Sequence, residues 1–320
     1  MRKSVALIVA TGLLVALAGC SSSSDSAAAG CTPPATAGAA SDLISATTDP
    51  QNPAGTFGTA PTLTVNTPVD LQTTQVTTLI KGTGATLPAG GVVSLDYILA
   101  DGTTGAISSK TPFDGSSYVI APVSSINLPG LRTALTCATE GSRLAIAIPP
   151  SEEVDPASST SGIPTDSVVM IVDVKGALPA RADGAVQPAQ AGFPSVALGP
   201  DGRPGITIPS GSVPTTASTA VLKRGDGATV AAGDGVWVQY TAVSWNTKAV
   251  TGSTWSDGSP TQVTAASDGS SKVPDLVGQT VGSQYISIVP PTVTDGSTTG
   301  DPTVYVVDVL GVTPVVSSTQ

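Results

Sequence analysis

The 320-residue chain contains no histidine, three cysteines, 3% aromatic residues and 11% charged residues. Without histidine it cannot form a Ser-His-Asp or Cys-His catalytic site, or a metal centre with histidine ligands. Three cysteines are too few for a four-cysteine zinc site. The carboxylates Glu152, Glu153 and Asp155 lack the spacing of an EF-hand calcium loop, so we interpret them as part of a solvated loop. We predict no metal and no cofactor, and a function that needs no imidazole chemistry.

Basic residues are also scarce, since 13 Lys and Arg stand against 23 Asp and Glu, which gives a net charge of −10. Nucleic-acid binding requires clustered cations that neutralise phosphates, so this charge argues against a nucleic-acid partner. Glycine (35) and proline (27) are abundant and leave few windows for long helices. The apolar residues are mostly scattered Val, Ile, Leu and Ala, and Val and Thr favour strands. The composition therefore predicts a β-rich fold.

The N-terminus has the features of an export signal. Arg2 and Lys3 precede an apolar run over residues 5–18, which is shorter than the roughly 20 residues of a membrane span. The run ends in Leu17-Ala18-Gly19-Cys20, which resembles a bacterial lipobox. This resemblance implies a signal peptide over residues 1–19, diacylglycerol on Cys20, and a location on the outer face of the cytoplasmic membrane. The alternative is an ordinary signal peptide that happens to precede a cysteine.

Residues 20–57 form the predicted lipidated tether and N-terminal segment. The part over residues 21–30 is rich in Ser and Ala and has nothing to bury, so we expect a flexible tether. Cys31 and Cys137 are the two remaining cysteines. An even pair outside the cytoplasm favours one disulfide between the N-terminal segment and a folded domain, while two free thiols are the alternative.

An internal repeat organises the rest of the chain. The segment 81–85 (KGTGA) aligns with 224–228 (RGDGA) 143 residues later, and the same separation relates Tyr97 to Tyr240. Later matches keep their order at separations that fall to 141 and then 135 residues. We predict two homologous domains over residues 58–178 and 200–313, a Pro/Ala/Gly-rich linker over 179–199, and a C-terminal tail over 314–320.

Each repeat reads as strands with one short helix. In the second repeat a turn at 233–235 precedes predicted strands, which are rich in β-branched and aromatic residues, over 236–243, 285–289 and 304–310. The predicted helix lies at 130–135 in the first repeat and near 274–278 in the second. We expect each repeat to fold as a sheet with this helix packed on it.

The order of these motifs resembles the FKBP family of peptidyl-prolyl isomerases. The matching segments of the second repeat are 225–227, 233–240, 281–284, 289–291 and 304–310. Those of the first repeat are 82–84, Tyr97, 128–131, 141–143, 148–150, 163–164 and 168–174. The resemblance implies a β-rich α+β fold with two FKBP-like domains, each an antiparallel sheet wrapped on one short helix. The combination of a lipoprotein signal with a tandem repeat resembles actinobacterial envelope isomerases.

The resemblance also implies a mechanism that needs no histidine. Rotation about a peptide bond faces a barrier of about 18–20 kcal/mol because of amide resonance. A dry aromatic pocket favours the twisted amide, which is less polar than the planar one, and so binds the transition state better than the substrate. No nucleophile or titrating base takes part.

The family pocket maps onto this sequence position by position. The implied pocket walls are, in the second repeat, Tyr240, Trp255 and Tyr305, and in the first repeat Tyr97, Leu128, Leu131 and Met170. Both repeats depart from the family pattern. Thr251 and Gly252 stand where the family has Phe and Asp, and Ser109 stands at the Asp position of the first repeat.

Two functions follow from these patterns. The first is a membrane-anchored prolyl isomerase that assists the folding of exported proteins and binds their proline-containing segments. The second is a catalytically inactive FKBP-like lipoprotein that binds peptides or serves as a scaffold, which the altered pocket positions favour. A glycan-binding β protein is less well supported, because sugar platforms need aromatic residues and these are few.

Overall fold

The computed structural model describes residues 31–116, 118–155, 164–294 and 297–313. The predicted signal peptide, the Cys20 lipidation site, the tether over 21–30 and the C-terminal tail lie outside these residues. Apart from Cys31, the described residues belong to one compact unit, Thr32–Gln320. No helix within the described part of the chain is long and apolar enough to span a membrane.

The first sheet is antiparallel and has the strand order β3-β7-β8-β4-β5, with β6 also paired to β4. Its strands are β3 (Gln75–Ile80), β4 (Val92–Asp101), β5 (Ile107–Lys110), β6 (Val119–Pro122), β7 (Arg143–Ile148) and β8 (Val168–Leu178). The central strand β8 is buried along most of its length, as expected for a β-branched run between two partners.

The second sheet is also antiparallel and has the order β9-β12-β16-β19-β13-β14, with β15 paired to β13. Its strands are β9 (Ala185–Val186), β12 (Ser218–Arg224), β13 (Gly235–Ser244), β14 (Val250–Ser253), β15 (Thr261–Thr264), β16 (Gln284–Val289) and β19 (Thr303–Thr313). The strands predicted at 236–243, 285–289 and 304–310 are confirmed as β13, β16 and β19. A small hairpin of β17 (Thr292–Thr294) and β18 (Ser297–Thr299) follows β16.

The sequence repeat is present in the strand pairing. Strands β3, β7, β8, β4, β5 and β6 of the first sheet correspond to β12, β16, β19, β13, β14 and β15 of the second. The irregularities correspond as well, since β4 and β13 shift register against their central partners at Ser94/Leu95 and at Trp237/Val238, 143 residues apart. Bulges tend to be retained because they set strand twist and aim side chains. The two sheets are therefore built on one plan.

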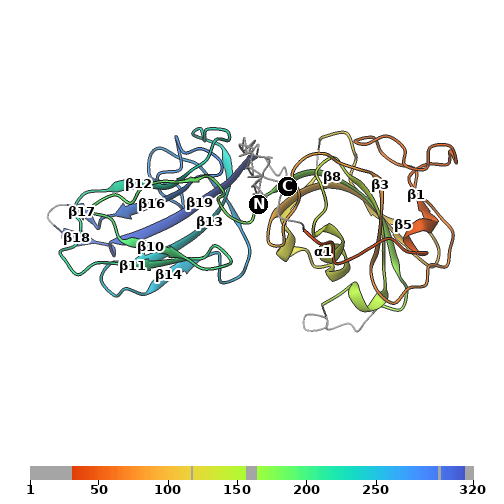
Figure 1. Cartoon of the computed structure of the whole chain (residues 1–320), viewed down its shortest axis with the longest axis horizontal. Coiled ribbons are helices and arrows are strands. Elements are labelled where there is room, and N and C mark those ends of the chain that lie inside the picture. Colours follow the sequence, from red (N-terminus) through yellow and green to blue (C-terminus); the bar gives the residue numbers. More distant parts are fainter. Residues whose placement is uncertain (1–30, 117, 156–163, 295–296, 314–320) are drawn as a thin grey trace, which may run out of the picture. The chain divides into compact units, whose positions relative to one another are not determined.

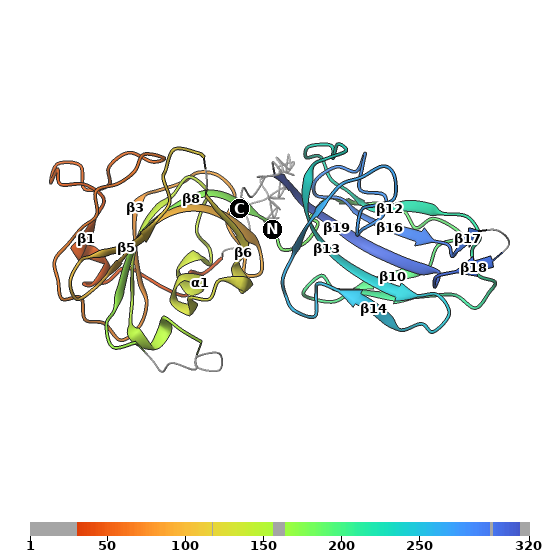
Figure 2. The ribbon, with the colours of Figure 1, turned by 180° about the vertical axis from the view of Figure 1, so that it is seen from behind.

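One predicted helix is present and the other is absent. Helix α1 (Pro129–Leu135) begins with proline at its first turn and lies within the curve of the first sheet, as Figures 1 and 2 show. It is the one α-helix among the described residues, which also include the short 3-10 helices Ser41–Leu43, Val123–Ser125 and Pro150–Glu152. The helix expected near 274–278 is replaced by turns. Asp275 and Gly278 have φ angles of +57° and +87°, and two left-handed residues within five prevent a continuous α-helix.

Each sheet has two apolar faces. We call the face that carries Tyr97 or Tyr240 the inner face; it holds the main core of each sheet. The outer faces bury smaller clusters beneath two hairpins, β1 (Ile44–Ser45) with β2 (Thr64–Val65), and β10 (Ser195–Leu198) with β11 (Pro204–Thr207). The segment predicted as a linker over 179–199 therefore contributes β9 and β10. These short strands were not predicted, because the proline and glycine content of the segment is typical of a linker.

A buried polar pair on the outer face of each sheet binds the segment that precedes it. In the first sheet Arg143 donates to both oxygens of Asp173, and both side chains are fully buried. The corresponding pair in the second sheet is Gln284, whose amide donates to Asp308, while Asp308 also accepts from the Ala182 backbone N–H. Burial raises the pKa of Asp308 above its ordinary value, although these hydrogen bonds oppose that effect.

Cys31 and Cys137 are both disulfide-bonded, which confirms the predicted disulfide and excludes the alternative of two free thiols. Downstream of Cys31, the chain runs along the outer side of strand β3, where the Val76 backbone N–H donates to the Thr36 carbonyl at 3.0 Å. The Gln75 side chain accepts from the Ala40 backbone N–H at 2.9 Å. The N-terminal segment thus covers an edge of the first sheet that would otherwise be exposed.

Candidate active site

The two inner faces present a tyrosine at the same place. Tyr97 on β4 and Tyr240 on β13 are half-buried and pack against the core of their own sheets. The Tyr97 backbone N–H donates to the Thr111 hydroxyl at 3.0 Å, and the Tyr240 N–H donates to the Thr254 hydroxyl at 2.9 Å. The backbone N–H of each threonine returns a bond to the tyrosine carbonyl. These paired bonds fix both tyrosines in equivalent positions.

The edge strands bring a second residue to each tyrosine. Ser109 on β5 pairs with Leu99, and Gly252 on β14 pairs with Ala242, which are corresponding positions of the two sheets. The Tyr97 and Ser109 hydroxyls lie 2.9 Å apart and share a hydrogen bond. A Cβ atom at Gly252 would lie 3.6 Å from the Tyr240 hydroxyl. Ser109 and Gly252, the positions at which the family resemblance expects an aspartate, therefore both adjoin the tyrosine hydroxyl.

In the second sheet two predicted pocket residues lie together. The rings of Tyr240 and Tyr305 have centroids 6.4 Å apart with an angle of 39° between their planes. Burial raises the pKa of the Tyr305 phenol, and the neighbouring Tyr240 contributes in the same direction. The Lys272 ammonium lies 5.9 Å from the centroid of the Tyr240 ring, at the outer limit of a cation–π contact.

A cavity of about 570 Å³ opens beside Tyr305. Its other walls are Val289 and the loop that replaces the second helix, with lining residues Ala266, Ser267, Gly269, Ser271, Lys272, Pro274, Asp275 and Val277. This volume falls within the range of about 300–1,000 Å³ typical of ligand sites. The arrangement provides an aromatic wall, apolar neighbours and a few polar groups at the rim.

The corresponding region of the first sheet is filled. Met170, at the position of Tyr305, and Leu131 on α1 are buried in the core. Leu128, just before α1, is partly buried against the same cluster, and so is Tyr97. The structure therefore brings the four predicted first-repeat residues together in one hydrophobic cluster, where Met170 and Leu131 are inaccessible.

A row of cross-strand partners explains why the second sheet leaves space. Met170 pairs with Ile146 on one side and Leu99 on the other. In the same register Tyr305 pairs with Ser287 and Ala242. The second sheet thus has smaller neighbours on both sides of the larger aromatic residue, and it lacks the helix that covers the first.

Trp255 does not belong to the hydrophobic cluster that contains Tyr240 and Tyr305. It is buried, and its ring carbon Cη2 would be 3.2 Å from a Cβ atom at Gly202. Its carbonyl accepts a hydrogen bond of 2.6 Å from the Arg203 guanidinium. The Trp255 backbone N–H also donates to the Ser253 hydroxyl at 3.3 Å, so Trp255 contacts both its own loop and the segment that precedes β11.

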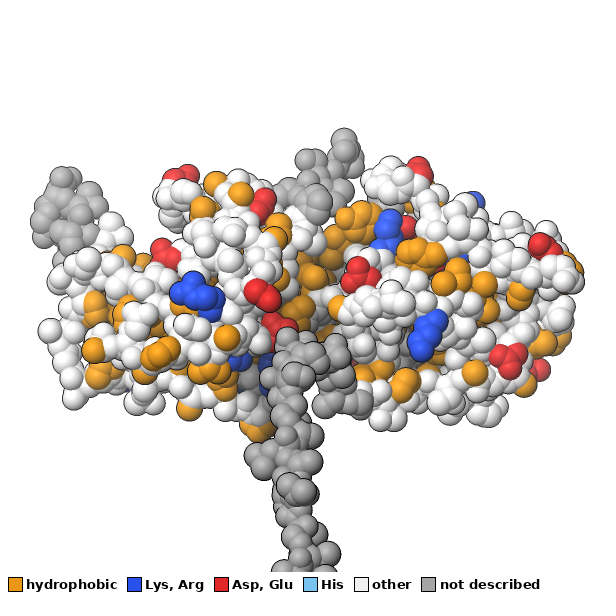
Figure 3. Space-filling model, turned by 45° about the horizontal axis from the view of Figure 1, so that its top comes forward, with side chains coloured by type: hydrophobic (Ala, Val, Ile, Leu, Met, Phe, Trp, Pro, Cys, Tyr) orange, Lys and Arg blue, Asp and Glu red, His pale blue; other side chains and the backbone are white. Residues whose placement is uncertain are grey.

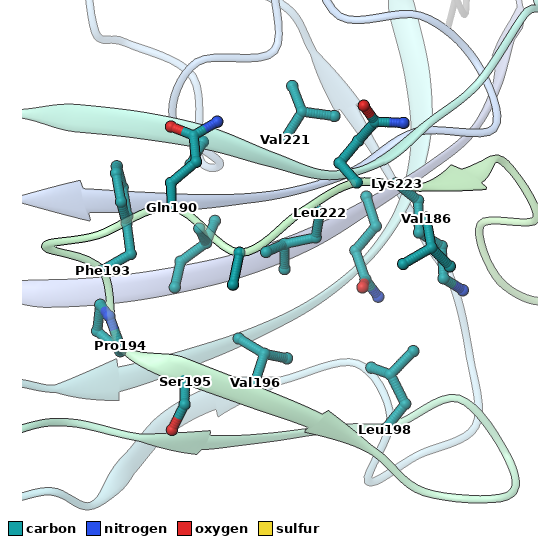
Figure 4. Close-up of a pocket in the computed structure, with 15 residues that line it drawn as sticks. Val186, Gln190, Phe193, Pro194, Ser195, Val196, Leu198, Val221, Leu222 and Lys223 are labelled. Atoms are coloured by element: carbon teal, nitrogen blue, oxygen red, sulfur yellow. The ribbon is translucent and has the colours of Figure 1, made fainter.

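A second cavity, of about 400 Å³, lies on the outer face of the second sheet and is shown in Figure 4. Phe193, Val196 and Leu198 line one side of it, and Leu222 from β12 lines the other. None of the residues predicted as pocket walls borders it. Sequence reasoning missed it because its lining comes partly from the segment 179–199, although apolar residues at 196 and 198 are spaced as in a strand.

The described residues contain no group of three or more Cys, Asp or Glu side chains able to hold a metal ion. Glu152, which we interpreted as part of a solvated loop, accepts a hydrogen bond of 2.7 Å from the Thr74 hydroxyl. On the face shown in Figure 3, lysine and arginine side chains are few and separate from one another.

No family model and no curated protein matches the sequence. Among solved structures, a peptidyl-prolyl cis-trans isomerase from Pseudomonas syringae is 20% identical, covers 32% of this chain and 74% of its own, and has a TM-score of 0.28. The three FKBP domains of wheat FKBP73 are 15% identical over 75% of this chain and 95% of theirs, with a TM-score of 0.32. FkpA from Escherichia coli is 18% identical over 32% of this chain and 46% of its own, with a TM-score of 0.27.

The structural neighbours are thus FKBP-type peptidyl-prolyl isomerases, including a protein with several FKBP domains, at low identity. All three TM-scores are low.

Proposed function

We propose that this protein is an FKBP-type peptidyl-prolyl cis-trans isomerase, anchored to the outer face of the cytoplasmic membrane through a lipid on Cys20. Its substrates are proline-containing segments of exported proteins. The observation that carries the proposal is the equivalent placement of Tyr97 and Tyr240 on the two inner faces. Each adjoins the position where the family resemblance expects the pocket aspartate.

The second-repeat cavity is the proposed substrate site. A prolyl ring placed against Tyr305 would lie between an aromatic wall and the apolar Val289 and Pro274. Such surroundings stabilise the twisted amide relative to the planar, more polar one, and lower the barrier of about 18–20 kcal/mol without any covalent step. The ring of Tyr240 lies next to that of Tyr305 and packs beside this wall.

The proposed location rests on features of the sequence together with the disulfide. The lipobox-like segment ending at Cys20 supports lipid anchoring. The bonded cysteines Cys31 and Cys137 support an oxidising compartment, since disulfides are rare in the bacterial cytoplasm.

A second candidate function is peptide binding without catalysis. Gly252 favours it, because this residue leaves the Tyr240 hydroxyl without the neighbouring polar side chain that Tyr97 has in Ser109. The turn in place of the second helix favours it too, because no helix covers this cavity.

Exchange spectroscopy by NMR distinguishes these functions. The chain from Ser21 onward keeps the whole compact unit and can be mixed with a blocked Ala-Leu-Pro-Ala peptide, whose cis and trans signals report exchange. We expect exchange at least tenfold above the spontaneous rate. The variant Tyr240→Ala should lose most of this acceleration, whereas Tyr118→Ala, at a half-buried tyrosine of the other repeat, should retain it.

The other outcomes separate the candidates. Peptide signals that shift or broaden without faster exchange would support the binding function. A folded protein that neither shifts the peptide signals nor accelerates exchange would overturn the proposal. Loss of activity in Tyr97→Ala, with Tyr240→Ala unaffected, would move catalysis to the first repeat.

A further inference from the structure

Two inner-face positions are polar in the second sheet and apolar in the first. In the first sheet Val76 on β3 pairs with Ile146 on β7, and both belong to the hydrophobic core. The corresponding pair in the second sheet is Thr219 on β12 and Ser287 on β16. Ser287 is fully buried and pairs on its other side with Tyr305, the aromatic wall of the cavity.

Both hydroxyls bind the same carboxylate oxygen. Thr219 donates to Oδ2 of Asp275 at 2.5 Å, and Ser287 donates to that oxygen at 2.6 Å. Asp275 belongs to the turn that replaces the second helix, and its backbone has a φ of +57°. Three differences from the first repeat therefore act together, and they hold one carboxylate in a defined orientation.

This carboxylate faces the cavity. Asp275 is exposed and lines the cavity together with Tyr305. Both hydroxyls use Oδ2, so Oδ1 is left for a ligand, and no cation pairs with Asp275 among the described residues. The fold does not require this arrangement, because the valine and isoleucine pair of the first sheet fills the same register without any polar group.

The charged groups of the cavity lie around its aromatic wall. Asp275 accepts a hydrogen bond from Ser287, and Ser287 is the cross-strand neighbour of Tyr305 on β16. The one ammonium of the lining, Lys272, lies over the ring of Tyr240 instead. If a substrate proline contacts Tyr305, the Asp275 carboxylate lies close to the residue next to that proline. Two hydrogen bonds hold this carboxylate in place, whereas Lys272 is held only by a weak cation–π contact.

We propose that Asp275 makes the cavity selective for segments in which a Lys or Arg side chain adjoins the proline. The cation would pair with Oδ1 while the prolyl ring contacts Tyr305. This inference rests on the proposed prolyl-binding function and specifies its substrate class.

The test compares three blocked peptides, Ala-Xaa-Pro-Ala, in which Xaa is Lys, Leu or Glu. NMR gives both the exchange rate and the signal shifts for each peptide with the chain from Ser21 onward. We expect the protein to accelerate exchange of the Lys peptide about three- to fivefold more than that of the Glu peptide in low salt. This ratio should be smaller at high salt, as for a partly exposed ion pair.

Variants assign the preference to this carboxylate. Asp275→Asn should remove it, and Asp257→Asn, at an exposed aspartate in another turn, should keep it. Thr219→Val retains the charge but removes one of its two supports, so its Lys/Glu ratio should fall between those of the wild type and Asp275→Asn. If Asp275→Asn does not fold, a lower Lys/Glu ratio in Thr219→Val would still assign the preference to Asp275.

Failure of this inference differs from failure of the proposed function. Equal effects on the three peptides, or a preference for Glu, would overturn the role of Asp275 and leave prolyl binding intact. No shift and no acceleration with any peptide would overturn the proposed function and this inference with it.

Discussion

Individual residues decide how far each repeat retains a working pocket. Tyr97 has a polar partner in Ser109 but faces a filled core. Tyr240 lies next to Tyr305, which lines an open cavity, but has only Gly252 beside its hydroxyl. A hydroxyl or carboxylate beside a phenol orients it and lowers the cost of burying it. The two repeats therefore lack different parts of the expected site.

Adding the missing group to the second repeat should increase activity. The φ of Gly252 is not in the left-handed region, and an added Cβ would make only ordinary contacts with the Tyr240 ring, the nearest at 3.5 Å. We expect Gly252→Asp to increase prolyl exchange about threefold or more, because its carboxylate would orient the Tyr240 hydroxyl. Ala232→Asp adds the same charge at an exposed turn position before β13 and should have no such effect. Equal rates for Gly252→Asp and wild type would contradict this role.

At the scale of elements, strands were the most predictable part of the chain. The runs at 236–243 and 304–310 contain β-branched and aromatic residues with glycine turns before them, so local preference and tertiary environment agree. The helix at 274–278 was predicted only by its place in the repeat, and left-handed Asp275 and Gly278 overrule that analogy. The outer hairpins were missed because β1, β2, β10 and β11 are short and lie among prolines and glycines.

The buried ion pair of Arg143 and Asp173 binds residues 54–59, which precede the first sheet. Besides binding Asp173, the Arg143 guanidinium donates to the carbonyls of Ala54 and Thr59, and Asp173 accepts from the Gly58 backbone N–H. Arg143→Met leaves Asp173 charged, buried and without its partner. We expect the free energy of unfolding to fall by about 3–5 kcal/mol, as when one member of a buried pair is removed.

Urea denaturation measures this loss, and limited proteolysis within residues 54–59 should become faster. The matched control is Arg224→Met, because the Arg224 side chain is exposed at the end of β12. Substitutions at such surface positions change stability by about 0.5 kcal/mol or less. Similar losses in the two variants would contradict the fastening role of Arg143.

At the scale of the whole molecule, the candidate site was only partly predictable. Tyr240 and Tyr305 were found because they lie on regular strands whose alternation fixes their face. The group formed by Thr219, Ser287 and Asp275 was missed, since its members are 56 and 12 residues apart and only the strand register shows that they meet. Trp255 was assigned by its position in a motif, but it is buried beside Gly202 and its carbonyl binds Arg203, contacts that the sequence pattern does not reveal.

The stability of the whole chain should depend on pH in part through Glu153. Burial raises the pKa of Glu153 to about 7, and the nearby charges of Asp101 and Asp166 add to the effect. Because this pKa is higher in the folded than in the unfolded chain, the folded state favours the protonated acid. The stabilising contribution is complete below the ordinary value of 4.5 and is lost as the pH rises through about 7.

Glu153→Gln mimics the protonated acid at every pH. At pH 8 this variant should be more stable than wild type by about 1 kcal/mol, an amount reduced for partial exposure to solvent, and the difference should vanish near pH 4. Urea denaturation of both proteins at intervals from pH 4 to 8 would give the difference directly. A difference that does not change with pH would show that Glu153 is solvated in the folded chain and that its two acidic neighbours do not affect it.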